Sequence, residues 1–152
     1  MRSWSFASLA CGIWLAVGAL ALAGDEKADD MQRIQGSWVV DPVTYKDVKD
    51  KEALKEVLKA AESMRFIFEG DTFTLKHPPA NEEKGGFRLD PTKKPKQIDL
   101  RDGAQGIYEL EGDTLKLCWD QQAKTNGRPT KFAHDKDKDS VHYFVLKREK
   151  KK

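Results

Sequence analysis

The sequence predicts an all-β fold of about eight short antiparallel strands, arranged as a sandwich or a barrel, with one short helix. Three observations carry this prediction. An apolar residue followed by Glu-Gly-Asp-Thr occurs twice, in FEGDTFTL at 68–75 and in LEGDTLKL at 110–117. Only one stretch, Glu52–Glu62, has its apolar residues at helical spacing. The strand-like segments between turn residues are short and regularly spaced, as in sandwiches and barrels.

The repeated phrase predicts two similar β-hairpins. Gly-Asp at 70–71 and again at 112–113 supplies the turns, because glycine tolerates the positive φ that tight hairpin turns require. The turns fix the pairs across each hairpin: Phe68 with Phe73, Phe66 with Leu75, Leu110 with Leu115, and Tyr108 with Leu117. Apolar residues therefore meet on one face of each hairpin. On the other face, Glu109 is expected opposite Lys116.

The other elements are placed by turn residues. The strand that starts the fold is expected at Ser37–Asp41, and residues 77–86 (HPPANEEKGG) are expected to form a loop because of their Pro and Gly content. Short strands at Phe87–Leu89 and Gln97–Arg101 are expected to flank the basic turn 90–96. A last hairpin is expected to join Arg128–His134 to Ser140–Arg148 around the acidic loop 135–139.

The first 23 residues have the pattern of a secretory signal peptide. Arg2 precedes an apolar run, and Ala21-Leu22-Ala23 provides an A-x-A cleavage pattern before polar residues. We therefore expect export, to the periplasm or out of the cell, of one domain spanning residues 24–152, with no stable membrane span after cleavage. Loss of Arg2 lowers the formal net charge from +2 to +1, which does not favour nucleic-acid binding.

Cleavage also removes Cys11 and leaves Cys118 as the one cysteine of the exported chain, so no intramolecular disulfide can form. Because apolar Leu117 and Trp119 flank it, we expect Cys118 to be a quiet structural residue. The basic tail at 147–152 (KREKKK) is expected to be a solvated end, with weak contact to an anionic surface as the alternative.

Several segments resemble the lipocalin-like domain family of exported proteins common in planctomycete bacteria. They are MQRIQGSW (31–38), RLDPTKKPKQIDL (88–100), GIYELEGDTLKLCW (106–119), RPTKF (128–132) and VLKRE (145–149). The resemblance spans nearly the whole exported chain. It implies an antiparallel lipocalin-like barrel of about eight strands and assigns no reaction.

The Gly36-Ser37-Trp38 segment also resembles the G-x-W motif of lipocalins. That resemblance implies that Trp38 closes one end of the barrel and that a basic residue of the last strand packs across its ring. Arg148 has the same strand parity as Leu146 and is the expected partner. Gly36, Trp38 and Arg148 are therefore expected to be structural.

Signatures of catalysis are scarce in the sequence. It has no G-x-S-x-G, H-E-x-x-H, P-loop or G-x-G-x-x-G pattern. His134 and His142 flank an acidic loop and would lie near each other across the expected last hairpin, where two imidazoles and a carboxylate can bind a transition metal. The lysines between its carboxylates, and the missing Gly and Glu of a calcium loop, favour a solvated hairpin loop instead. We expect no enzymatic activity, no cofactor and no metal site.

The expected function is binding of a small hydrophobic or amphipathic ligand inside the barrel, because eight-stranded barrels either fill with side chains or hold one small molecule. The alternative is a filled barrel that recognises a protein partner through loops 77–86, 90–96 and 120–128. The candidate ligand-lining residues are Phe66, Phe68, Phe73, Tyr108, Leu117, Trp119, Phe132, His134 and His142. Each of them could equally belong to an ordinary β core.

Overall fold

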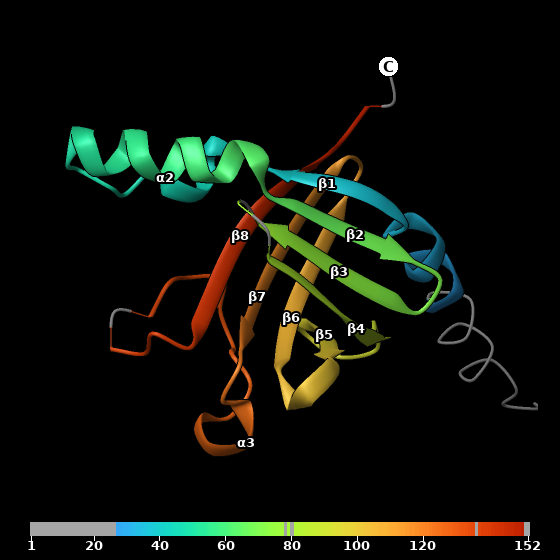
Figure 1. Cartoon of the computed structure of the whole chain (residues 1–152). Helices are drawn as coiled ribbons and strands as arrows, with labels where there is room; N and C mark the ends of the chain where they lie inside the picture. The colour runs from blue at the N-terminus through green and yellow to red at the C-terminus, as the bar shows by residue number, and fades with distance from the viewer. Residues whose placement is uncertain (1–26, 78, 80, 136, 151–152) are drawn as a thin grey trace, which may run out of the picture.

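The structure, a computed structural model, describes residues 27–77, 79, 81–135 and 137–150. The predicted signal peptide at 1–23 lies outside the described residues. Eight antiparallel strands form a closed barrel in chain order, with the last strand paired to the first (Figure 1). The strands are β1 (Gly36–Val40), β2 (Arg65–Glu69), β3 (Thr72–His77), β4 (Asn81–Asp90), β5 (Lys96–Leu100), β6 (Gln105–Glu111), β7 (Thr114–Asp120) and β8 (Val141–Arg148). The all-β barrel expected from the sequence is confirmed.

The two predicted hairpins are present with the predicted register. Phe66 faces Leu75 and Phe68 faces Phe73 in β2–β3, and the corresponding apolar pairs of β6–β7 are Tyr108 with Leu117 and Leu110 with Leu115. Gly70 and Gly112 have φ values of +59° and +53°, as the turns require. Glu109 forms the predicted cross-strand ion pair with Lys116. The repeated phrase therefore marks two hairpins whose apolar faces meet inside one barrel.

The prediction of a loop at 77–86 is wrong for most of that segment. Residues 81–86 form the first part of β4 and pair with β3 from Asn81, opposite His77, to Gly86, opposite Thr72. The charged side chains of Glu82, Glu83 and Lys84 are exposed. A polar sequence can form a strand here because the neighbouring strand supplies the backbone hydrogen bonds while these side chains remain in solvent.

The predicted last hairpin is also wrong. Residues 128–134 form no strand, because β8 already pairs with β7 on one side and with β1 on the other. This segment, which we call the strap, lies on the outer face of the barrel. The Arg128 guanidinium donates hydrogen bonds to the carbonyls of Ile98 (2.8 Å) and Gly106 (2.7 Å), and Cys118 Sγ lies 3.8 Å from the carbonyl of Ala133.

Helical elements lie at both ends of the barrel. One end, which we call the closed end, carries the two Gly-Asp turns and a helical segment at 27–33. The other, the open end, carries η1, α2, η2 and α3. Their bounds are Pro42–Tyr45 for η1, Lys51–Ser63 for α2, Arg101–Gly103 for η2 and Ala123–Asn126 for α3.

Helix α2 confirms the predicted helix. Asp50 caps it by accepting hydrogen bonds from the backbone N–H groups of Glu52 and Ala53, both at 2.9 Å. Its last turn buries Ala61 and leads directly into β2. Within the described residues, no helix is long and apolar enough to cross a bilayer.

Candidate ligand-binding site

The closed end is sealed by the predicted tryptophan and arginine. Trp38 is fully buried, and its indole N–H donates to the carbonyl of Ile34 at 2.8 Å. The Arg148 guanidinium carbon lies 4.2 Å from the centre of the Trp38 ring. Arg148 also donates to the carbonyl of Gln35 (2.7 Å), and its Nη1 lies 3.4 Å from where a Cβ on Gly36 would stand. The predicted stacking of Arg148 on Trp38 is confirmed.

A buried carboxylate ties the helical segment to the same end. Asp30 is almost fully buried and accepts hydrogen bonds from the Tyr108 hydroxyl at 2.7 Å and from Lys96 Nζ at 2.8 Å. Arg33 approaches its other oxygen at 3.5 Å. The sequence analysis did not find this cluster. Its members come from three distant segments of the chain, and no local sequence pattern indicates that they meet.

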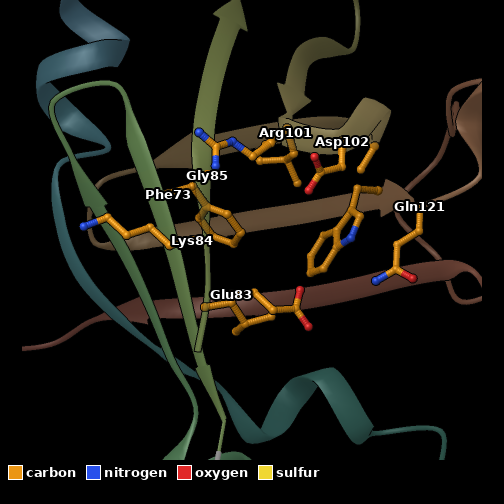
Figure 2. A pocket seen from close by; sticks show the side chains of 11 residues that line it. Phe73, Glu83, Lys84, Gly85, Arg101, Asp102 and Gln121 are labelled. Carbon is orange, nitrogen blue, oxygen red and sulfur yellow. The ribbon is translucent and has the colours of Figure 1, made fainter. Parts of the chain in front are cut away.

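The open end is hollow where the closed end is filled. A hollow of about 290 Å³ lies between β4 on one side and η2 on the other, and we call it the η2 hollow (Figure 2). Its lining residues are Phe73, Leu75, Glu83, Lys84, Gly85, Leu100, Arg101, Asp102, Ala104, Trp119 and Gln121. Its floor is therefore apolar, and charged side chains stand at its rim.

A second hollow of about 380 Å³ adjoins the first beneath the end of α2, and we call it the α2 hollow. Its lining residues are Ala60, Met64, Leu75, His77, Glu83, Trp119, Gln121, His142 and Phe144. Four residues belong to both hollows: Leu75, Glu83, Trp119 and Gln121. The two hollows therefore adjoin each other around Trp119, and we call them together the mouth.

The wall of the mouth includes a polar atom without a partner. His142 stacks on Trp119 with ring centres 5.2 Å apart, and its Nε2 is buried without a hydrogen-bond partner among the described residues. Burial lowers the pKa of His142 below its ordinary value of 6.5, so the ring is neutral at pH 7. A neutral imidazole can still donate or accept one hydrogen bond at each nitrogen, according to its tautomer. Because Nε2 is itself buried, a bound molecule would reach it only if neighbouring side chains moved.

The structure divides the predicted ligand-lining residues into three groups. Phe73, Trp119 and His142 line the mouth. Phe66, Phe68, Tyr108 and Leu117 point into the barrel but are fully buried in its packed core, below the mouth. Phe132 and His134 lie on the strap, outside the barrel.

The expected meeting of His134 with His142 does not occur. The His134 and Phe132 rings both pack against Tyr143, with centres 5.7 and 6.4 Å away. Tyr143 precedes Phe144 in β8 and faces outward, whereas His142 and Phe144 face inward against Trp119. The two histidines therefore lie on opposite faces of β8. No group of three or more His, Cys, Asp or Glu side chains suited to a metal ion occurs within the described residues.

Cys118 is buried on the outer face beneath the strap. Burial raises the pKa of its thiol, which disfavours the reactive thiolate. This setting agrees with the expected structural role.

Comparisons of the chain with protein-family models, with curated proteins and with solved structures find no match.

Proposed function

We propose that this protein binds a small hydrophobic or amphipathic molecule, without transforming it, in the mouth at the open end of the barrel. The observation that carries the proposal is the joined hollow around Trp119, in whose wall His142 Nε2 has no partner among the described residues. Buried polar atoms are nearly always hydrogen-bonded. A ligand seated on Trp119 would supply the missing partner once a small side-chain movement exposes this buried atom.

The composition of the mouth supports the same proposal. Small-molecule sites are mostly apolar hollows of roughly 300–1,000 Å³ with a few polar groups that orient the ligand. Here Leu75, Trp119 and Phe144 provide the apolar wall. His142 and Gln121 are the polar groups beside them. The ligand would sit near solvent, because the lower barrel is already filled by Phe66, Phe68 and other core residues.

That filled lower barrel is the observation favouring the second candidate, a protein-interaction module. Large aromatic side chains occupy the interior from the closed end upward. In this alternative the loops of the open end would contact a protein partner, and the mouth would receive one of its side chains.

The cellular setting belongs to the proposal as well. We propose that the chain is exported after cleavage of residues 1–23, because of the signal-peptide pattern. We also propose that it is related to the lipocalin-like family named above. The order of the quoted motifs and the stacking of Arg148 on Trp38 support this relationship.

The proposal can be tested with the neutral fluorescent probe N-phenyl-1-naphthylamine, titrated into the exported chain (residues 24–152). We expect saturable binding with enhanced emission. The variant Gln121→Trp places an indole in the part of the mouth that both hollows share, and it should weaken binding at least about fivefold, or about 1 kcal/mol.

Gln122→Trp is the matched control. Gln122 is the next residue, is also exposed, and lines neither hollow. It should bind the probe like the parent chain. Equal affinity in all three proteins would place the probe elsewhere and contradict the proposal. The absence of saturable binding to the parent chain would also contradict it, and would favour the interaction module.

A further inference from the structure

We propose that the ligand of this mouth is an organic anion, with an apolar body on Trp119 and a single carboxylate-like head group held by Arg101. This inference rests on the proposed function and adds the chemical class of the ligand. It is carried by three features of the η2 hollow: a split in the barrel wall, the position of Arg101 across that split, and the arrangement of the neighbouring charges.

The wall of the barrel is split between β4 and β5. Their pairing runs from Asp90, opposite Gln97, to Phe87, opposite Leu100. The remaining part of β4, residues 81–86, is paired with β3. Beyond Leu100 the chain turns into η2 rather than continuing beside β4. The η2 hollow lies in this split, so a ligand could enter the mouth from the side as well as from the end.

Arg101 reaches across the split from η2 to β4. A Cβ placed on Gly85 would come within 2.4 Å of Arg101 Cβ and 2.8 Å of its Cδ. The absence of a side chain at Gly85 therefore allows the aliphatic part of Arg101 to lie directly on β4. Figure 2 shows this side chain extending from η2 toward β4, at the rim of the hollow.

The Arg101 side chain is exposed, and its guanidinium has no partner among the described residues. It makes no side-chain hydrogen bond or ion pair with any described residue, whereas Arg33, Arg65, Arg128 and Arg148 all form ion pairs with carboxylates. A guanidinium carries only donors, in a planar fork that matches a carboxylate. At the rim of an apolar hollow, its natural complement is the anionic head of a ligand whose body lies inside.

The other charges at the rim leave this position open to an anion. Glu83 lies 3.5 Å from His77 Nε2 and forms the β4 side of the rim where the two hollows join. Lys84 lines the hollow, but its side chain extends away from the other lining groups (Figure 2). Asp102, beside Arg101 in η2, and Glu83 are the two carboxylates of the lining, and Asp102 is the one adjacent to Arg101 in the chain. It has a φ of +67°, in the left-handed region.

The test compares two probes with similar aromatic bodies and different heads. One is the anion 8-anilinonaphthalene-1-sulfonate, and the other is the neutral N-phenyl-1-naphthylamine. Both are titrated into the exported chain at about 0.15 M salt, where long-range attraction to surface lysines is screened within about 8 Å. Because hydrogen bonds to charged groups contribute about 1.5–3 kcal/mol, the anion should bind at least about tenfold more tightly.

Three variants locate the source of that preference. Arg101→Gln should weaken binding of the anion about tenfold and change binding of the neutral probe less than about twofold. Lys124→Gln is the matched control, because Lys124 is exposed and lies beside Gly103 of η2 but lines neither hollow. It removes the same charge and should change both affinities less than about twofold. Asp102→Asn removes the opposing charge and should strengthen anion binding about twofold.

The outcomes separate this inference from the function on which it rests. If the parent chain binds both probes equally, or if Arg101→Gln and Lys124→Gln weaken the anion alike, the Arg101 site is overturned while a neutral ligand site survives. If neither probe binds the parent chain, the proposed function and this inference fail together. Urea unfolding of each variant confirms that the changes in affinity are not changes in folding.

Discussion

The polar groups at the two ends of the barrel differ in whether they have partners within the protein. At the closed end, the Trp38 N–H, the Tyr108 hydroxyl and the Asp30 carboxylate all have partners within the chain. At the open end, His142 Nε2 and the Arg101 guanidinium have none among the described residues. The same strands thus form a packed end whose polar groups have partners and an open end where these two groups do not.

This difference indicates that the closed end contributes mainly to stability and the open end mainly to binding. A satisfied polar cluster in a packed core fixes one arrangement and adds stability. A buried polar atom left without a partner, such as His142 Nε2, costs stability, and such costs are concentrated at functional sites, whereas the exposed Arg101 is hydrated. We therefore expect substitutions at the closed end to lower stability and substitutions at the open end to alter binding.

The largest effect is expected at the closing tryptophan. Trp38→Ala should lower the free energy of unfolding by about 3–5 kcal/mol, because it leaves a cavity and removes the surface on which Arg148 stacks. Trp119→Ala should cost clearly less, since one side of that residue already borders the mouth. Urea unfolding of both variants measures the difference. A loss below about 1 kcal/mol for Trp38→Ala would show that it does not seal the barrel.

The next effect concerns the buried carboxylate. Asp30→Ala should lower the unfolding free energy by about 2–3 kcal/mol, because it removes a buried carboxylate that accepts hydrogen bonds from the Tyr108 hydroxyl and from Lys96 Nζ. Asp29→Ala is the control. Asp29 is exposed and pairs with the partly exposed Arg33, so its loss should cost less than about 0.5 kcal/mol. Equal costs for the neighbouring residues would refute the anchoring role of Asp30.

Two single substitutions, one at each end, are expected to change the stability of the protein in opposite directions. Tyr108→Phe should destabilise the protein by about 1 kcal/mol, since it deletes a satisfied hydroxyl beside Asp30. His142→Phe should be neutral or stabilising by up to about 1 kcal/mol, because it deletes a buried nitrogen that has no partner among the described residues. Thermal unfolding of the two variants measures the direction of both stability changes. Destabilisation of similar size by both changes would mean that the ends do not differ in this way.

The smallest expected effect is a pH dependence. The folded-state pKa of His142 is lowered by burial, so the unfolded chain binds a proton that the folded chain does not. Stability from this group is complete above its ordinary pKa of 6.5 and is lost as the pH falls below that value. His142→Phe should reduce the loss between pH 7 and about 5.

This pH window is separate from that of Glu149. The Ser37 hydroxyl donates a hydrogen bond to Glu149 and lowers the pKa of that carboxyl below 4.5, so its contribution is lost in more acidic solution. An unfolding free energy with the same slope between pH 7 and 5 in the parent chain and the His142→Phe variant would contradict the buried, neutral imidazole.

Much of the barrel could be predicted because its signals are local. A Gly-Asp turn fixes the register of its hairpin, and strand parity then assigns every side chain to a face. This reasoning predicted the β2–β3 and β6–β7 pairs. The Trp38–Arg148 contact was predicted from the G-x-W resemblance together with strand parity.

The remaining features depend on tertiary contacts that leave no local pattern. Phe132 and His134 were assigned to a strand, but β8 had no free edge to accept one, so the strap lies outside the barrel. Asp30 meets Lys96 and Tyr108 across 66 and 78 residues of chain. The importance of Gly85 appears only when Arg101 is seen to lie on it.

The most direct test of the binding site is to map where a probe contacts the barrel. Amide chemical shifts of the isotopically labelled exported chain would be followed while 8-anilinonaphthalene-1-sulfonate is added. We predict saturable changes around Leu75, Trp119, Gln121 and His142, with Trp38 and Tyr108 at the closed end unaffected. Changes centred on the closed end, or scattered over the lysine-rich surface without saturation, would contradict a binding site in the mouth.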